Sequence, residues 1–299
     1  GISNVRNGQV QVNIHTFRKR SVTSDDIMYK TKSSNASIFK YKNDAYLTTS
    51  KTHPWKINHD LQIDTEHVLY NFPCTTLNKV YHGDIYSIQP FDTYFNIHIM
   101  GELHESITMD RSETCKDFAI FNEFAAILVN GGDCSKIIMV HLPSLTTTEY
   151  IVPNTTFVRA HGMYQMDNGI ISIYTSLTKN DTRVMQKFEF DESNYSMRIR
   201  ELPVTIGHSS MIDYRGNIYT IDDYTFTKYN LISGQYKTRA FSHILDSNCA
   251  VSDDVMCITA HDDTRIYTHF IDIRTMGSIL TESISGAQPM MSSVWVQAV

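Results

Sequence analysis

Residues 209–241, SSMIDYRGNIYTIDDYTFTKYNLISGQYKTRAF, decide the fold class. Four runs rich in β-branched and aromatic residues, SSMIDY, NIYTID, TFTKYNL and YKTRAF, are separated by short turns at RG, Asp223 and ISGQ. Polar and apolar residues alternate in NIYTI and YKTRAF, as they do in strands with one buried face. Short alternating runs joined by turn residues are typical of β-hairpins. The stretch therefore predicts a four-stranded antiparallel sheet.

The same order of runs and turns recurs along the chain. Residues 117–152, 161–202 and 249–284 each contain four comparable runs, and further copies begin near residues 37 and 83. The first tight turns of the units are separated by 40, 39, 46, 47 and 38 residues and lie near Asn43, Gly83, Asn122, Asn168, Arg215 and Asp253. A four-stranded unit that repeats at this spacing is the pattern of a β-propeller blade.

The two ends of the chain are predicted to complete the ring. Six units use residues 35–285, and SSVWVQAV (292–299) is predicted to be the innermost strand of one more blade, with outer strands from residues 8–17 and 25–32. Such closure removes the open sheet edges that invite aggregation. We therefore predict a single all-β domain over residues 1–299, a seven-bladed β-propeller of four-stranded antiparallel blades, closed by strands from both termini. The predicted blades are approximately 35–75, 76–113, 115–155, 157–204, 205–243, 244–285, and 286–299 plus 1–34.

Composition narrows the class of protein. Hydrophobic residues make up 41% of the 299 residues, charged residues make up 19%, and the net charge is −6. These values fit a folded globular protein and argue against a nucleic-acid binder, which usually carries a basic surplus. No apolar run reaches the roughly 20 residues that span a bilayer, and the opening residues lack the apolar core of a signal peptide.

The five cysteines favour a reducing compartment. None forms a CxxC pair, so we expect free thiols and no structural zinc site. We expect the chain in the cytoplasm or nucleus. Because four N-x-S/T sequons are present, secretion stays as the alternative.

Several residues resemble those of WD40-like and kelch-like propellers. Gly207 and His208 precede the run SSMIDY, as a Gly-His pair precedes the innermost strand of a WD40 blade, and aspartates stand in the predicted turns between second and third strands. Gly131 and Gly132 follow a second strand, as in kelch blades, whereas the Trp-Asp dipeptide of WD40 blades does not occur at all. This blade-level resemblance implies a propeller that binds partner proteins.

Candidate binding residues gather in the second-to-third-strand turns and the connections between blades, which open on one face of a propeller. A ring of aspartates with His82, His161 and His208 could bind a divalent metal or attract a basic peptide. Aspartate is also common in tight turns because it caps its own backbone, and this alone explains the pattern. The predicted partner-binding residues are His53, Trp55, Asp92, Asp133, His161, Asp181, His208, Asp223, Tyr224, Asp262 and Asp263.

Two further features have alternative interpretations. Trp55, beside His53 in a predicted turn, could anchor a partner, or it could begin a strand and pack between blades. The cluster Arg18, Lys19 and Arg20 could bind an anionic ligand, or it could protect an edge strand from aggregation.

The sequence contains none of the motifs H-E-x-x-H, G-x-S-x-G, the P-loop or the Rossmann glycines. We therefore assign no catalytic residue, metal or cofactor. We predict a non-catalytic platform or scaffold that binds a peptide or partner protein on the loop face around the central channel, as part of a larger assembly. The alternative is an enzyme or a small-ligand or metal binder that uses the Asp/His ring.

Overall fold

The structure is a computed structural model in which every regular element of the described residues is a β-strand. No helix among these residues is long and apolar enough to cross a membrane. The structure describes residues 2–5, 9–18, 21–30, 36–57, 63–132, 134–165, 169–179, 182–202, 209–212, 217–230, 232–252, 254–285 and 290–292.

Six four-stranded antiparallel sheets are each formed by strands that follow one another in sequence. The first consists of β4 (Ala36–Tyr41), β5 (Asp44–Thr49), β6 (Thr52–Ile57) and β7 (Ile63–Val68). The second consists of β8 (Leu77–Tyr81), β9 (Asp84–Pro90), β10 (Tyr94–Ile99) and β11 (Glu102–Thr108). The third consists of β12 (Thr114–Phe121), β13 (Phe124–Asn130), β14 (Cys134–His141) and β15 (Thr146–Pro153).

The next three sheets follow the same plan. The fourth consists of β16 (Thr155–Gln165), β17 (Ile171–Lys179), β18 (Thr182–Asp191) and β19 (Ser196–Glu201). The fifth consists of β20 (Ser209–Ile212), β21 (Asn217–Asp222), β22 (Thr225–Asn230) and β23 (Tyr236–Ala240). The sixth consists of β24 (Ile244–Ser252), β25 (Val255–His261), β26 (Arg265–Asp272) and β27 (Gly277–Ser285).

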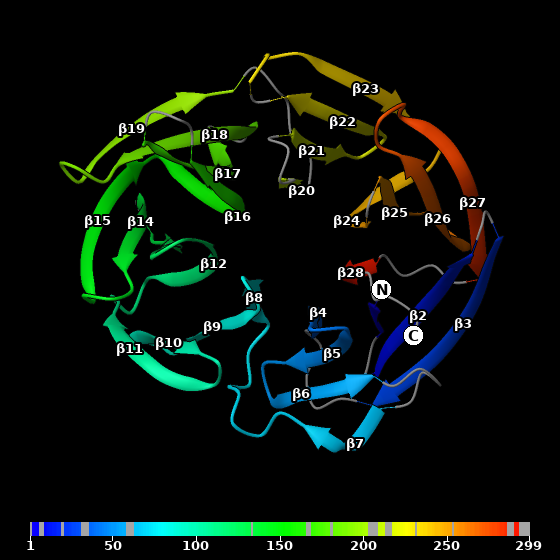
Figure 1. The fold of residues 1–299 in the computed structure, drawn as a ribbon, viewed down its shortest axis with the longest axis horizontal. Coiled ribbons are helices and arrows are strands. Elements are labelled where there is room, and N and C mark those ends of the chain that lie inside the picture. The colour runs from blue at the N-terminus through cyan, green and yellow to red at the C-terminus, as the bar shows by residue number, and fades with distance from the viewer. Residues whose placement is uncertain are drawn as a thin grey trace.

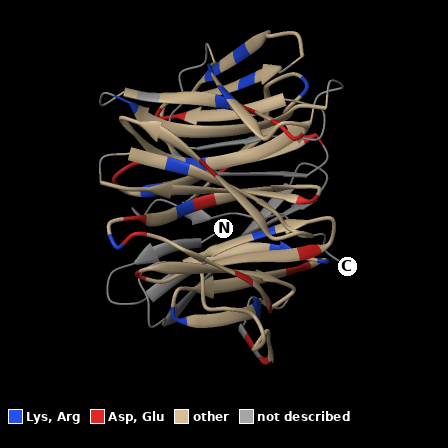
Figure 2. Ribbon diagram, turned by 90° about the vertical axis from the view of Figure 1, so that its left-hand side faces the viewer, with Lys and Arg blue, Asp and Glu red and all other residues tan. Residues whose placement is uncertain are grey.

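The sheets stand around a common axis, so the chain is a β-propeller (Figure 1). The first strand of each sheet lies nearest the axis and the fourth lies at the rim. Seen from the side, basic and acidic residues are interspersed along the strands and turns (Figure 2). We refer to the sheets as blades and name each by its strands.

The prediction of a seven-bladed propeller is corrected at the closure of the ring. Only the six blades above are each made by one continuous segment, and the remaining sheet is a composite with the order β28-β1-β2-β3. Its strands are β28 (Met290–Ser292), β1 (Ile2–Val5), β2 (Gln9–Arg18) and β3 (Ser21–Lys30).

Of the predicted closing strand SSVWVQAV (292–299), only Ser292 lies among the described residues. The strand next to the axis in the composite sheet is Met290–Ser292, and residues 293–299 lie outside the described residues. The N-terminal segment supplies three strands rather than the predicted two. Its first strand, β1, pairs with β2 from Ile2↔Val12 to Val5↔Gln9, a local hairpin that the sequence analysis did not include.

Burial falls from the second strand of a blade to its outer strand. Every residue of β13 except Asn130 is buried, and Asn217–Ile221 of β21 are all buried as well. No residue of the outer strands β11 and β23 is buried. An inner strand is covered on both faces because each blade is packed between two neighbours, so the half-buried pattern inferred for NIYTI underestimated its burial.

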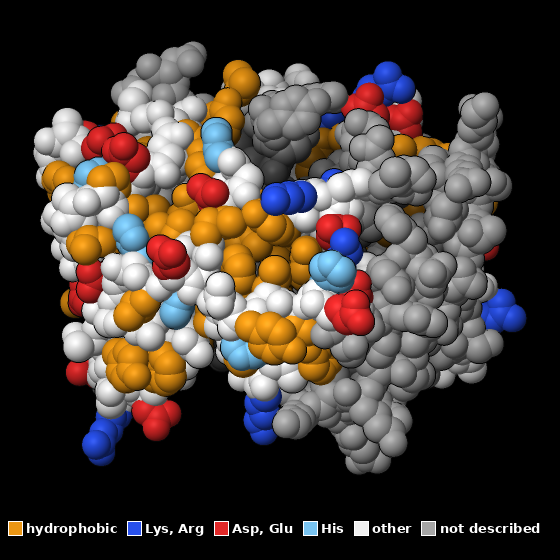
Figure 3. Space-filling model, turned by 60° about the horizontal axis from the view of Figure 1, so that its bottom comes forward, with side chains coloured by type: hydrophobic (Ala, Val, Ile, Leu, Met, Phe, Trp, Pro, Cys, Tyr) orange, Lys and Arg blue, Asp and Glu red, His pale blue; other side chains and the backbone are white. Residues whose placement is uncertain are grey.

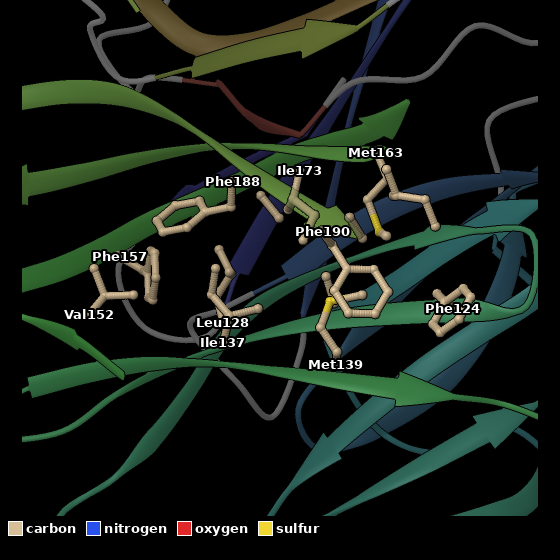
Figure 4. Packing of buried hydrophobic residues seen from close by; sticks show 14 of the residues in the cluster. Phe124, Leu128, Ile137, Met139, Val152, Phe157, Met163, Ile173, Phe188 and Phe190 are labelled. Atoms are coloured by element: carbon tan, nitrogen blue, oxygen red, sulfur yellow. The ribbon is translucent and has the colours of Figure 1, made fainter. Parts of the chain in front are cut away.

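The largest hydrophobic cluster fills the space between the β12–β15 and β16–β19 blades (Figure 4). Leu128 and Ile137 from the first blade face Phe157 and Phe188 from the second, and all four are at most 1% exposed. Complete burial of side chains of this size contributes about 1.5–3 kcal/mol each. Packing between blades, rather than within one sheet, therefore holds the ring together.

Asp117 on β12 adds a polar link between three blades. Its carboxylate accepts hydrogen bonds from the Ala160 backbone N–H of β16 (2.9 Å) and from the Phe118 backbone N–H (2.9 Å). The Lys79 ammonium of β8 lies 3.4 Å from the same carboxylate. Because Asp117 is only 8% exposed, these partners offset the cost of burying its charge.

Candidate functional site

A cleft of about 340 Å³ opens between the β12–β15 and β16–β19 blades. It is at the lower end of the size range of small-molecule sites. Its lining comes from the β12–β13 and β18–β19 turns and from the adjoining ends of β13, β16 and β17, all on one face of the ring. We call it the interblade cleft, and its lining residues are Asn122, Glu123, Phe124, Gln165, Ile171 and Glu192.

The β12–β13 turn is held in place by a neighbouring blade. Asn122 has φ +49°, a left-handed conformation that asparagine tolerates better than most residues. The Tyr81 hydroxyl donates a hydrogen bond to Asn122 Oδ1 (3.1 Å) and accepts one from the Asn122 backbone N–H (2.9 Å). This two-point contact fixes the turn that presents Glu123 and Phe124 to the cleft.

The apolar part of the cleft lies at the edge of the hydrophobic cluster described above. Phe124 is 3% exposed and its ring meets the ring of Phe190 edge to face, with 5.3 Å between centroids (Figure 4). The imidazole of His141 lies 5.0 Å from the same Phe124 ring. The base of the cleft is therefore well packed, and its mouth is formed by polar side chains.

The charged residues that line the cleft are both acidic. Glu123 and Glu192 contribute carboxylates, and the described lining residues include no lysine or arginine. The neighbouring Asp191 is turned away into its own turn, where hydrogen bonds from the Ser193 hydroxyl and backbone N–H, and from the Asn194 amide, lower the pKa of its carboxyl group. Glu192 is an exposed residue of the β18–β19 turn, so its carboxylate can be reached by a ligand.

A chain of hydrogen bonds runs away from the cleft behind Glu123. The Glu123 carboxylate lies 3.3 Å from Nε2 of His141, and Nδ1 of His141 lies 2.6 Å from the hydroxyl of Ser144. The Ser144 hydroxyl is in turn 2.8 Å from that of Thr146. A carboxylate, an imidazole and a hydroxyl are thus connected in series at the rim of the cleft.

The predicted site residues lie elsewhere in the fold. Asp92, Asp223 with Tyr224, and Asp262 with Asp263 occupy the predicted turns between second and third strands. His161 is a partly buried residue of β16, and Arg18 ends β2. The remaining predicted residues lie outside the described ones and are Lys19, Arg20, Asp133, Asp181 and His208.

Three residues are placed differently from the prediction. His53 and Trp55 belong to the strand β6 rather than to a turn, and His53 Nδ1 donates a hydrogen bond to the Phe72 carbonyl (2.6 Å). Trp55 is partly buried in that strand, in agreement with the packing alternative. His82 lies in the β8–β9 turn with φ +50°, at the opposite end of the blade from the second-to-third-strand turns.

The best-defined predicted aspartate serves its own turn. The Asp262 carboxylate accepts hydrogen bonds from the Tyr267 hydroxyl (2.7 Å) and from the backbone N–H groups of Thr264 (2.7 Å) and Arg265 (2.8 Å). These bonds hold the pKa of Asp262 well below its usual range, with the Tyr267 bond as the largest cause. Within the described ranges no group of three or more His, Cys, Asp or Glu residues could hold a metal ion. For Asp262, the geometry favours the interpretation as a turn cap.

Exposed hydrophobic side chains are distributed over the outer strands and turns. Tyr70, Leu103, Ile151 and Tyr236 are among them, each on a different blade or connection. On the side shown in Figure 3, hydrophobic side chains reach the surface between histidines and acidic residues. Scattered exposed hydrophobic residues of this kind are ordinary for a folded protein.

Glu123, His141, Ser144 and Glu192 are not among the predicted site residues. They lie in the runs FNEF, HLPSL and DESN, which form turns on the face opposite to the second-to-third-strand turns. A comparison of the chemical groups on both faces would have singled out HLPSL, where a histidine and a serine are three residues apart. Its distance to Glu123 depends on strand pairing and is not visible in sequence.

Comparison with known proteins shows the fold but no family. No family model matches the sequence, and no curated protein sequence matches it significantly. The resemblance to WD40-like and kelch-like propellers therefore stays a prediction.

Solved structures with a similar fold include enzymes. A chimera of apocarotenoid oxygenase and RPE65 matches with a TM-score of 0.70 and 13% identity, over 88% of this chain and 74% of that chain. A mutant of Synechocystis apocarotenoid oxygenase matches with a TM-score of 0.69 and 14% identity over the same shares of the two chains. The computationally designed Ika8 protein matches with a TM-score of 0.51 and 10% identity, over 88% of this chain and 90% of that chain.

These similarities correct the predicted function. The prediction of a non-catalytic scaffold rested on the premise that a propeller without a catalytic motif is a binding platform, yet propellers with this fold include oxygenases. Fold alone decides neither role. This chain is similar in fold to the apocarotenoid oxygenases.

Proposed function

We propose that this chain is an enzyme that acts on a small molecule, and that the substrate binds in the interblade cleft. The substrate is a polar compound that is neutral or positively charged. The observation that carries the proposal is the lining of the cleft, which combines a buried aromatic base with amide and carboxylate groups at the mouth. Sites for small ligands usually have this combination of apolar surface and a few directed polar groups.

The charges of the lining support the choice of substrate. Glu123 and Glu192 have no cationic neighbour in the lining, so an anion that entered would meet two like charges. The amides of Asn122 and Gln165 can donate and accept hydrogen bonds. A hydroxylated or ammonium-bearing molecule satisfies these groups, and the volume limits it to a small one.

The known enzymes with a similar fold support only the general point that such a ring can carry a catalytic site. Their oxygenase activity is not transferred, because the identity of 13–14% supports the fold alone. A reducing compartment, cytoplasm or nucleus, remains our proposal. It is supported by the free thiols of Cys74, Cys115 and Cys134.

Ligand binding tests this proposal directly. Unfolding temperature is measured with choline, glucose and citrate as cationic, neutral and anionic probes, because a ligand that binds only the folded state stabilises it. We expect choline or glucose to raise the unfolding temperature and citrate to have no effect. Glu192→Gln should weaken the effect of choline by about tenfold in concentration, equivalent to about 1.4 kcal/mol.

The matched control is Glu102→Gln. Glu102 is an exposed carboxylate on the outer strand β11, outside the cleft, and its replacement changes the net charge equally. Equal effects of the two substitutions, or stabilisation by citrate alone, would contradict the proposal.

A further inference from the structure

The hydrogen-bonded series Glu123, His141 and Ser144 has the composition of a nucleophile, a base and a group that orients the base. The Ser144 hydroxyl lies 2.6 Å from Nδ1 of His141, within range for proton transfer. The Glu123 carboxylate, 3.3 Å from Nε2, can only accept a hydrogen bond when ionised, so it favours the imidazole tautomer with its proton on Nε2. That tautomer leaves Nδ1 free to accept the proton of the Ser144 hydroxyl.

The turn that carries this series is held at several points. The Leu145 N–H donates to the His141 carbonyl (2.8 Å), and the Leu142 N–H donates to the Glu123 carbonyl (2.8 Å). Leu142 is 6% exposed, and its own carbonyl accepts a hydrogen bond from His104 Nε2 on the β8–β11 blade (2.9 Å). The Ser144–His141 geometry is therefore preorganised, as catalysis requires.

The series also adjoins the interblade cleft. Glu123 and Phe124 both line the cleft and both contact His141, whose side chain is 20% exposed. Ser144 is exposed and lies on the side of the imidazole away from Glu123. A substrate whose polar part lies in the cleft would have to extend past Glu123 and along the imidazole to bring a bond next to the hydroxyl.

We propose that Ser144, His141 and Glu123 hydrolyse a small ester whose polar part occupies the interblade cleft. The inference rests on the proposed function of that cleft. Ser144 is the nucleophile, His141 is the general base and acid, and Glu123 is a positioning residue.

The reaction balances with water as the only co-reactant. Ser144 Oγ bonds to the acyl carbon while its proton moves to His141 Nδ1, and the ester C–O bond then breaks as that proton passes to the leaving alcohol. Water attacks the acyl-serine, its proton moves to Nδ1 and on to Ser144 Oγ, and the carboxylic acid leaves. One ester and one water give one acid and one alcohol.

A fluorophosphonate probe tests the nucleophile without knowledge of the natural substrate. The Ser144 Oγ–P bond forms, the P–F bond breaks and fluoride leaves, and mass spectrometry of peptides identifies the labelled residue. We expect label on Ser144 and none at that position in Ser144→Ala. His141→Gln should lower the labelling rate by roughly 100-fold, the usual contribution of a general base.

Two substitutions separate a catalytic role from a structural one. Glu123→Gln should lower the limiting labelling rate by about tenfold, with an unchanged half-saturating probe concentration and unfolding temperature. Ser233→Ala is the matched control, because Ser233 is an exposed serine in the corresponding β22–β23 turn and has no histidine partner in the described structure. The rate at which Ser144 is labelled in the Ser233→Ala variant should equal the rate in the unsubstituted chain.

The outcomes distinguish the two proposals. Choline binding that depends on Glu192, without label on Ser144, would overturn the hydrolytic inference and leave the cleft proposal standing. Label on Ser144 whose rate is unchanged in His141→Gln would also overturn the inference, because the base would then have no role. Label on Ser144 that depends on His141, without binding of any of the three ligands, would support the catalytic roles of Ser144 and His141. It would overturn the proposed function of the cleft.

Discussion

A buried histidine in the β24–β27 blade should make the stability of this protein depend on pH. His269 on β26 is 6% exposed, its Nδ1 lies 3.0 Å from the Thr281 hydroxyl, and its buried Nε2 has no hydrogen-bond partner in the described structure. Burial lowers the pKa of His269 from 6.5 to about 4, and the nearby His243 and Arg239 contribute in the same direction. The imidazole is therefore neutral in the folded protein at pH values where it is protonated in the unfolded chain.

The direction and size of the change in stability follow from the pKa of His269 in the unfolded chain, 6.5, and in the folded protein, about 4. Between pH 6.5 and pH 4 the unfolded state binds the proton and the folded state does not. Stability is therefore fully present above about pH 7, falls as the pH drops toward 4, and loses nothing more from this group below that value. At about 1.4 kcal/mol for each pH unit, the free energy of unfolding should fall by about 3 kcal/mol across this range.

Urea unfolding at several pH values between 7 and 4 measures this loss. His269→Asn removes the titrating group, so its free energy of unfolding should vary with pH by about 3 kcal/mol less than that of the unsubstituted chain. His82→Asn is the control, because His82 is exposed in the β8–β9 turn. If His269→Asn and the unsubstituted chain show the same dependence on pH, burial of His269 does not shift its pKa and the reasoning is wrong.

Substitutions at four positions test the packing of the fold, each measured by urea unfolding at pH 7. Asp117→Ala should cost about 2 kcal/mol, because the buried Ala160 and Phe118 N–H groups lose their acceptor, and a loss below 0.5 kcal/mol (about a third of one hydrogen bond) would contradict that role. Phe190→Ala should cost about 3–5 kcal/mol by leaving a cavity beside Phe124, and Phe190→Leu should cost clearly less. Gly101→Ala should destabilise more than Gly83→Ala: both glycines have positive φ, but a Cβ at Gly101 would lie 2.7 Å from the Asn71 carbonyl oxygen, whereas one at Gly83 meets nothing within 4 Å. Equal losses at the two glycines would show that only the backbone conformation matters.

Much of the strand pattern could be predicted from local chemistry. NIYTID and TFTKYN correspond to β21 and β22, and the turns near Asn43, Gly83 and Asn122 lie between the first two strands of their blades. Turn residues and β-branched runs act over a few neighbours, so the sequence displays them directly. Trp55 was misplaced because β6 begins at Thr52, and the tight turn before it lacks a glycine or proline signal.

Long-range pairing decided what the sequence left open. The composite sheet joins Met290–Ser292 to Ile2–Val5, residues at opposite ends of the chain, and such closure depends on the whole ring rather than on either segment. For the same reason, local sequence did not predict that Met290–Ser292 takes the place next to the axis.

In the candidate site, too, local sequence predicts some features and long-range pairing decides the others. Residue types alone determined that Asp262 would suit a turn, and its hydrogen bonds to Thr264 and Arg265 are local. Glu123 and His141 are 18 residues apart and meet only because β13 and β14 pair from Phe124 to Asn130, and Glu192 reaches the cleft only because two blades pack together. Local composition thus determined strands and turns, whereas the tertiary structure alone brought the groups of the cleft together. Side chains interact over a few ångströms, and the number of residues between two side chains does not show how far apart they lie in space.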